Sequence, residues 1–160
     1  MITAPQLVIR HALALEADKL TAIAIRGKLR WGYSASQVDA WRSHLKVSAE
    51  SIREQPTYVA ELEQRPIGFY ALAMGVKVWD LVHLWVDAPY ASAGYDRVLL
   101  GHALRVAADA GIEAIGVDAD PQAESFYRAC GGFCTGSVAA PTADQPNRVR
   151  PQFVFLCGGL

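Results

Sequence analysis

The sequence has few cysteines, no long hydrophobic run and no signal-peptide pattern at its N-terminus. Its three cysteines, Cys130, Cys134 and Cys157, cannot all pair with one another and show no Cys-x-x-Cys spacing. This disfavours a disulfide framework and a zinc site, so we expect reduced thiols and no bound metal. No apolar stretch reaches the ~18 residues that would span a membrane. Together these absences predict a soluble, cytoplasmic protein with no membrane partner.

The chain also lacks an excess of charge of either sign. Its 15 Lys and Arg residues balance 16 Asp and Glu residues, and its formal net charge is −1. A protein that binds nucleic acid usually carries a basic excess, so nucleic acid is not an expected partner. Apolar residues make up 52% of the chain and charged residues 19%, which excludes disorder. With 160 residues, we expect one domain over 1–160.

Hydrophobic patterning and turn residues predict alternating strands and helices. The expected strands are 7–10, 57–63, 66–74, 78–86, 115–117, 133–138 and 153–157, and the expected helices are 15–29, 36–43, 48–54, 96–111 and 121–131. Ser36 and Ser48 are the expected N-caps of the two short helices. Three consecutive strands favour antiparallel pairing, whereas the two strand–helix alternations favour parallel pairing. The prediction is therefore an α/β (α+β) fold with a mixed sheet and a polar loop over 141–152.

One segment predicts a class of ligand. The apolar strand Leu81–Val86 is followed by a small-residue turn, Ala91–Gly94, which opens a helix at Asp96. The first backbone N–H groups of such a helix have no intrahelical acceptor and point toward a common region. The aligned peptide dipoles add roughly half a positive charge there. This place in the fold therefore suits an anion, typically a phosphate.

Five local motifs, in this order, resemble the GNAT superfamily of N-acetyltransferases, which use acetyl-coenzyme A. They are Ile9–Ala12, Lys28–Tyr33 (a Lys-x-x-Trp-Gly-Tyr signature), Leu84–Tyr90, Asp118–Tyr127 and Arg148–Pro151. The resemblance spans nearly the whole chain. It implies a mixed, mostly antiparallel central sheet of about seven strands flanked by helices. It also implies transfer of an acetyl group from acetyl-CoA, the co-substrate, to an amine.

The resemblance implies where acetyl-CoA would lie. The acetyl group and pantetheine arm would follow backbone groups of Leu84, Trp85 and Val86, with Ser125 as a further contact of that arm. The diphosphate would lie at the turn before the helix. There the implied cofactor-binding residues are Ala91, Gly94, Tyr95, Asp96 and Arg97.

The turn departs from the family pattern, Gln/Arg-x-x-Gly-x-Gly/Ala. These positions fall on Ala91, Gly94 and Asp96, so only Gly94 matches. A carboxylate at Asp96 would repel a diphosphate by ~1 kcal/mol at 4 Å in bulk water, and by more if partly desolvated. We interpret Asp96 as the N-cap of the helix, worth ~1 kcal/mol, with Arg97 offsetting part of its charge. The departure leaves open a binding module that keeps this fold but has lost coenzyme recognition.

For catalysis, the resemblance implies Tyr127 as the general acid that protonates the departing thiolate. A phenol, with an ordinary pKa of ~10, is protonated at neutral pH. The alternative is a core aromatic beside Phe126. His83 is a candidate general base, because imidazole transfers protons near neutrality. Strand alternation places it on the face of Trp85. Asp80, Glu61 and a water molecule are the alternatives.

The acceptor is expected to be a primary amine of a small molecule or peptide, attacked in a ternary complex. The resemblance implies that Trp31 and Tyr33 line the acceptor pocket, where they would pack an apolar substrate or face a cationic amine. Packing at the helix end is the alternative for both rings. A transferase that uses another acyl-CoA fits the sequence equally well. The apolar C-terminal strands are compatible with a homodimer.

Overall fold

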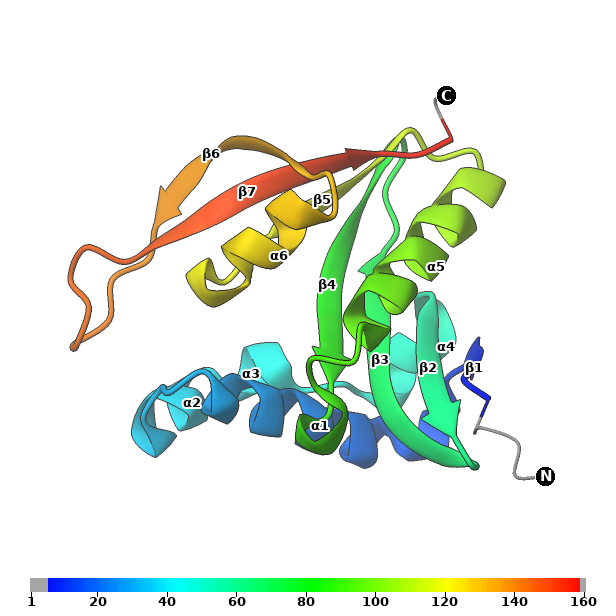
Figure 1. Cartoon of the computed structure of the whole chain (residues 1–160), viewed down its shortest axis with the longest axis horizontal. Helices are drawn as coiled ribbons and strands as arrows, with labels where there is room; N and C mark the ends of the chain where they lie inside the picture. The colour runs from blue at the N-terminus through cyan, green and yellow to red at the C-terminus, as the bar shows by residue number, and fades with distance from the viewer. Residues whose placement is uncertain (1–5, 159–160) are drawn as a thin grey trace. The chain divides into compact units, whose positions relative to one another are not determined.

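The computed structural model describes residues 6–158 and forms an α/β fold of seven strands and surrounding helices (Figure 1). In chain order its elements are β1 (Val8–His11), η1 (Ala14–Glu16), α1 (Ala17–Arg30), α2 (Ala35–Ala40), α3 (Arg42–Leu45), α4 (Ala49–Glu54), β2 (Thr57–Leu62), β3 (Arg65–Ala73), β4 (Val78–Val86), η2 (Ala88–Tyr90), α5 (Tyr95–Asp109), β5 (Ala114–Asp118), η3 (Pro121–Ala123), α6 (Glu124–Ala129), β6 (Phe133–Ala139) and β7 (Val149–Leu156). No helix within 6–158 combines the length and apolarity that crossing a bilayer requires.

The strands form one sheet in the order β1-β2-β3-β4-β5-β7-β6. The pairs β1–β2, β2–β3, β5–β7 and β6–β7 are antiparallel, and β4–β5 is parallel. The expected mixed, mostly antiparallel sheet is therefore confirmed. Only the helix α5 crossover joins parallel neighbours. The second expected parallel pair is absent from the described registers, because β7 lies between β5 and β6 and runs antiparallel to both.

The chain divides into two compact units, one formed by 1–72 and 83–101 and the other by 73–82 and 102–160. In the first unit, α1 to α4 cover one face of β2 and β3. Their shared core consists of Leu20, Ile23, Ala24, Val38, Leu45, Val47, Ile52, Val59 and Phe69. On the other face, a side chain at Gly68 of β3 would meet Leu99 of α5. Burial of apolar area on both faces is the main stabilising contribution to this unit.

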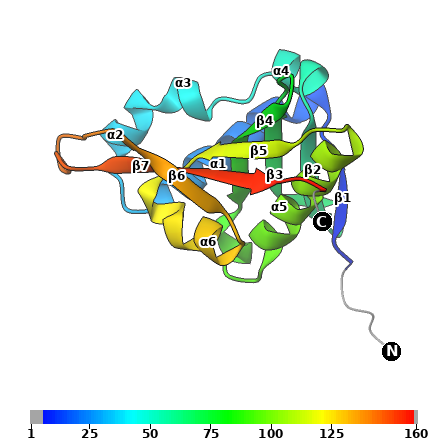
Figure 2. The same ribbon diagram turned by 90° about the horizontal axis from the view of Figure 1, so that it is seen from above.

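In the second unit, α6 lies along β6 and β7 (Figures 1 and 2). Its Tyr127 ring contacts Phe153 and Phe155 of β7, at centroid distances of 5.8 and 6.2 Å. Gly132, just after α6, allows this close packing, because a Cβ there would lie 2.8 Å from Phe155 Cζ and 2.9 Å from the Tyr127 carbonyl oxygen. A buried ion pair of 3.0 Å between Arg148 and Asp120 ties the start of β7 to η3.

Several predicted boundaries need correction. The turn between β2 and β3 is Glu63–Gln64, whose φ values of 48° and 64° suit a two-residue hairpin. Ser34, not Ser36, caps α2 by accepting a hydrogen bond from the Gln37 amide. Strand β7 begins at Val149, inside the segment predicted to be a loop, because Pro151 occupies a position that pairs with Ser137 without needing an N–H. The prediction that Ser48 caps α4 is confirmed.

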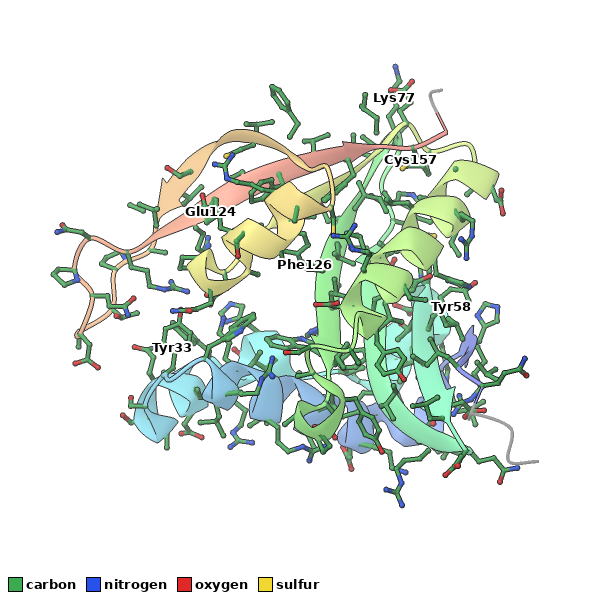
Figure 3. All side chains as sticks on the ribbon, in the orientation of Figure 1. Tyr33, Tyr58, Lys77, Glu124, Phe126 and Cys157 are labelled. Carbon is green, nitrogen blue, oxygen red and sulfur yellow. The ribbon has the colours of Figure 1, made fainter. Side chains whose placement is uncertain are left out.

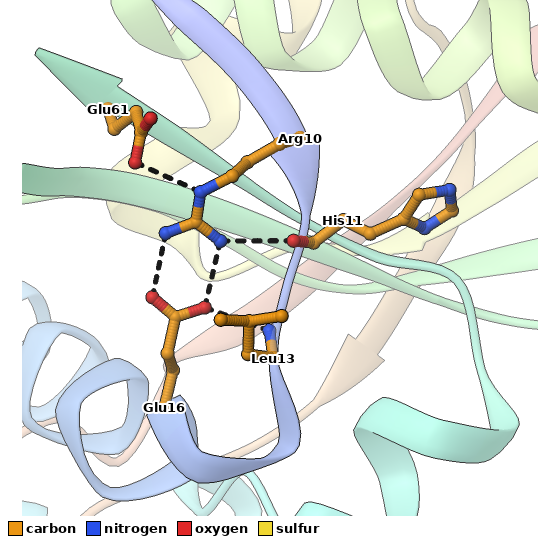
Figure 4. A network of polar contacts seen from close by, with 5 residues as sticks. All are labelled: Arg10, His11, Leu13, Glu16 and Glu61. Atoms are coloured by element: carbon orange, nitrogen blue, oxygen red, sulfur yellow. Dashed lines mark hydrogen bonds and ion pairs between the residues drawn. The ribbon is translucent and has the colours of Figure 1, made fainter. Parts of the chain in front are cut away.

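Arg10 of β1 joins the first strand to its neighbours in the first unit (Figure 4). Its guanidinium donates to both carboxylate oxygens of Glu16 at 2.9 and 2.8 Å, and its Nε donates to Glu61 at 2.9 Å. The buried Glu16 also accepts the Leu13 amide, which caps η1. The Arg10 hydrogen bonds hold the pKa of the Glu16 carboxyl below its ordinary value. The structure thus gives Glu61, an alternative base, a structural partner.

Candidate active site

The end of β4 and the start of α5 lie in the first unit and bring together most of the predicted site residues. Leu84, Trp85 and Val86 are half-buried at the end of the strand. Gly68 of β3 lies close beneath them, since a Cβ there would lie 2.7 Å from the Trp85 carbonyl oxygen and 3.3 Å from Val86 Cα. A larger residue at this position would displace the backbone of β4.

The turn before α5 has the backbone that an anion cradle needs. Ser92 and Gly94 adopt positive φ values of 69° and 86°, and a Cβ at Gly94 would meet nothing within 4 Å. The first helical hydrogen bond runs from the Val98 amide to the Gly94 carbonyl oxygen, at 3.2 Å. The helix therefore begins at Tyr95, one residue before the prediction. Asp96 is the second residue of the helix rather than its N-cap.

The Asp96 carboxylate engages the turn itself. Its Oδ1 accepts a hydrogen bond from the Arg97 amide at 2.8 Å. That amide is one of the donors in the first turn that have no intrahelical acceptor. An anion at this helix end therefore meets a carboxylate that already uses one donor and adds repulsion. Rotation of the half-buried Asp96 side chain would release the amide.

Asp87, which the sequence analysis did not single out, anchors the entry to this turn. The guanidinium of Arg26 on α1 donates to both of its carboxylate oxygens at 2.9 and 2.8 Å. Asp87 also accepts the Ala88 amide and so caps η2, while its own amide donates to the Ile67 carbonyl oxygen at 2.7 Å. The Arg26 hydrogen bonds lower the pKa of the Asp87 carboxyl. Only a structure could pair these two residues, because 61 positions separate them.

An aromatic cluster connects α1 with the end of β4. The rings of Trp31 and Trp85 lie 5.2 Å apart, and those of Tyr33 and Trp41 meet edge to face at 4.9 Å. Lys28 Nζ lies 5.4 Å from the ring centroids of Trp31 and Tyr33 and 4.7 Å from that of Trp41, within range of cation–π attraction. Trp31 and Tyr33 thus share one cluster, whose half-buried rings offer an apolar wall (Figure 3).

Gly27 allows this cluster to reach β4. A Cβ at Gly27 would lie 2.8 Å from Trp85 Cζ3, and closer still to Cε3. The indole therefore occupies the space that a side chain would fill on α1. A glycine inside a helical pattern is a recognisable signal of such a close approach. The sequence analysis missed Gly27 although that signal was present.

His83 lies on the face of β4 that carries Trp85, as strand alternation predicts. The Trp85 indole Nε1 donates a hydrogen bond to His83 Nδ1 at 3.2 Å, and the Phe69 ring packs 5.5 Å away. Burial lowers the pKa of the imidazole to about 4. His83 is therefore neutral at physiological pH, with its Nδ1 lone pair occupied. Asp80, the other alternative base on β4, is exposed in the second unit.

Tyr127 and Ser125 lie on α6, in the second unit. Tyr127 is buried and Ser125 is exposed, so Tyr127 is the inward-facing aromatic residue of the helix. Phe126, labelled beside Glu124 in Figure 3, contacts the Tyr127 ring at 5.1 Å. The packing of Tyr127 on Phe153 and Phe155 accounts for the ring. It leaves the role of the hydroxyl as a prediction.

Comparison with known proteins identifies the class to which this fold and site belong. The family model described as Acetyltransferase (GNAT) family matches residues 24–132, more than half of the chain. The chain belongs to this family, which supports acetyl transfer in general. Among curated protein sequences, none matches the chain.

Solved structures share the fold at low sequence identity. A GCN5-related N-acetyltransferase from Rhodopseudomonas palustris is 22% identical, with a TM-score of 0.76 and 98% of each chain covered. The PaiA N-acetyltransferase from Thermoplasma acidophilum, solved in complex with coenzyme A, is 18% identical with a TM-score of 0.73, covering 94% of this chain and 99% of that one. The ribosomal-protein-S18-alanine N-acetyltransferase from Escherichia coli is 14% identical with a TM-score of 0.75, covering 97% and 96%. At these identities the likeness establishes the fold.

Proposed function

We propose that this chain transfers an acetyl group from acetyl-CoA to a primary amine of a small molecule or peptide, by direct attack in a ternary complex. The observation that carries the proposal is the turn between β4 and α5, where Ser92 and Gly94 adopt positive φ before a helix N-terminus. Such a turn directs backbone N–H groups at an anion, and a diphosphate is the anion that coenzyme A presents. Family membership supports the same chemistry.

The residues of the turn fit a diphosphate with one exception. The helix terminus, the open space at Gly94 and the exposed Arg97 all favour an anion. Asp96 opposes it by ~1 kcal/mol at 4 Å in bulk water, and by several times more if partly desolvated. Several backbone donors, each worth about 1 kcal/mol, outweigh one such repulsion when the site stays hydrated. We therefore expect coenzyme binding that is weaker than an uncharged residue at this position would allow.

In the proposed reaction, backbone groups of Leu84, Trp85 and Val86 hold the thioester. Fixed backbone donors suit this role, because they need no reorganisation as charge develops on the carbonyl oxygen. The neutral amine attacks the carbonyl carbon, the carbon–sulfur bond breaks, and the Tyr127 phenol gives its proton to the thiolate. Water takes the proton that the ammonium group must lose. Trp31 and Tyr33 contribute an apolar wall against the body of the acceptor.

A second candidate function follows from the hydrogen bond between Asp96 and the Arg97 amide. In this alternative the carboxylate permanently occupies the helix terminus, and the chain is a binding module of the same fold with weak or no coenzyme recognition. Replacing Asp96 by Gly would then create coenzyme affinity that the natural chain lacks. Under the transferase proposal, the natural chain already binds and the variant only improves on it.

The proposal is tested by following thiol release from acetyl-CoA, and from other acyl-CoA donors, over a panel of primary amines. The panel contains aromatic, aliphatic and polyamine acceptors and peptides with a free N-terminus. We expect amine-dependent release of coenzyme A with at least one acceptor, and an acetylated product of matching mass. Release at the same rate without any amine, together with no product, would contradict transfer and favour the binding module.

A further inference from the structure

The geometry points to Trp85 as a positioning residue that fixes His83 as a neutral hydrogen-bond donor, so that His83 does not act as a base. The inference concerns residues of one unit, the end of β4 with α1 and β3. It deepens the proposed function by assigning the group on β4 that faces the reaction. It also rests on the proposed function for its catalytic consequence.

The hydrogen bond between the two side chains determines the tautomer. An indole N–H can only donate, so His83 Nδ1, at 3.2 Å, must accept and carries no proton. A neutral imidazole then has its proton on Nε2. Protonation to the imidazolium would place an N–H at Nδ1 opposite the indole N–H, two donors facing each other. The hydrogen bond therefore opposes the charged ring, in the same direction as burial beside Phe69.

The indole has little freedom to leave this hydrogen bond. One edge of the ring lies against Gly27 of α1, closer than any Cβ at that position would permit. The Trp31 ring lies 5.2 Å away, and the Trp85 backbone passes close over Gly68 of β3. Two glycines thus make room for the residue, one for its side chain and one for its main chain. A ring held on both sides keeps its N–H directed at His83.

This tautomer leaves His83 with one available function. Its single lone pair is engaged at Nδ1, so it has no free acceptor for a proton from the amine. Its Nε2–H remains a donor that suits an oxygen atom, such as the acetyl carbonyl as negative charge develops there. A donor of this kind, unlike a base, does not require the ring to titrate during the reaction.

The tautomer is tested by long-range ¹H–¹⁵N correlation spectra of the full-length chain, which distinguish protonated from unprotonated ring nitrogens. The chain has four histidines, so His83→Gln identifies the signal of His83. We expect the natural protein to show an Nε2-protonated ring from pH 5.5 to pH 8. Trp85→Phe removes the indole N–H, and we expect it to give a mixture of tautomers. Trp31→Phe removes a tryptophan from the same cluster but keeps the hydrogen bond, and should leave the His83 signal unchanged.

A proton on Nδ1 in the natural protein would overturn the inference, as would the same spectrum in Trp85→Phe and the natural chain. The natural chain decides the tautomer even if a variant fails to fold. These spectra need no coenzyme, so a chain without acetyl transfer would refute the proposed function and leave this result standing. In the active enzyme, His83→Gln keeps a donor whereas His83→Leu does not. We expect His83→Leu to lower kcat at least tenfold more than His83→Gln, and equal losses would refute the donor role.

Discussion

Replacing Gly27 by Ala tests the packing of Trp85 against α1. The new Cβ would lie 2.8 Å from Trp85 Cζ3 and closer to Cε3, within the distance that real side chains avoid. The obstacle is the face of a held indole rather than the end of a flexible chain. Inserting a methyl group into such a contact typically costs about 1–3 kcal/mol. The gain in helix propensity from Gly to Ala, about 1 kcal/mol, offsets only part of it.

Gly101 supplies the matched control, because it is also a glycine inside a helix. A Cβ at Gly101 of α5 would meet nothing within 4 Å. Gly101→Ala should therefore stabilise the protein by about 1 kcal/mol through helix propensity alone. Gly27→Ala should be less stable than Gly101→Ala by about 1–3 kcal/mol, since that difference isolates the contact with Trp85. Both free energies of unfolding can be measured by urea denaturation followed by circular dichroism.

The Trp85 contact would also be visible in a second substitution. Trp85→Leu removes the ring that meets the new methyl group, so Gly27→Ala should cost less in that background than in the natural chain. Stabilisation by Gly27→Ala equal to that by Gly101→Ala would refute the reasoning. So would an equal cost in both backgrounds, because the penalty would then come from something other than the indole.

Three further predictions follow from the site and its supports. Asp96→Asn removes one charge at the helix terminus, so it should tighten acetyl-CoA binding by roughly fivefold, the equivalent of ~1 kcal/mol; Asp109→Asn, at the far end of α5, makes the same change in net charge and should leave affinity unaltered in calorimetric titration. Tyr127→Phe keeps the ring contacts with Phe153 and Phe155 but removes the phenol proton, so kcat should fall by roughly 10²–10⁴-fold with coenzyme affinity nearly unchanged, and an unaltered rate would end the general-acid assignment. Because Arg10 depresses the Glu16 pKa below its ordinary value of 4.5, this carboxylate stabilises the fold above that pH and loses its contribution as the pH falls through the lowered value; Glu16→Gln should cost about 2 kcal/mol at pH 7, and a urea-unfolding difference that stays constant down to pH 3 would contradict this.

The fold was predictable largely because its signals are local. Strand alternation and turn residues place β4 at the predicted 78–86, and Ser48 caps α4 as expected. The helix start at Tyr95 was missed by one residue, because Asp96 resembles an N-cap while Gly94 already supplies the first helical carbonyl. The start of β7 was missed because Pro151 is a loop signal in sequence.

The site was less predictable, because its supports are non-local. Strand periodicity could place His83 and Trp85 on one face, but it could not show that an indole N–H occupies the imidazole lone pair. The pairing of Arg26 with Asp87 and the approach of Trp85 to Gly27 depend on how α1 packs on the sheet. Those contacts decide which side chains can exchange protons. The roles of Tyr127, the turn residues and the acceptor wall remain predictions.

The central claim is that the turn around Gly94 binds the diphosphate of acetyl-CoA despite the carboxylate of Asp96. Isothermal titration of the natural chain with acetyl-CoA, repeated at two salt concentrations, measures this directly. The account predicts saturable one-to-one binding that weakens as salt rises, because the contact is partly ionic. Absence of both heat and thermal stabilisation at millimolar acetyl-CoA would contradict it.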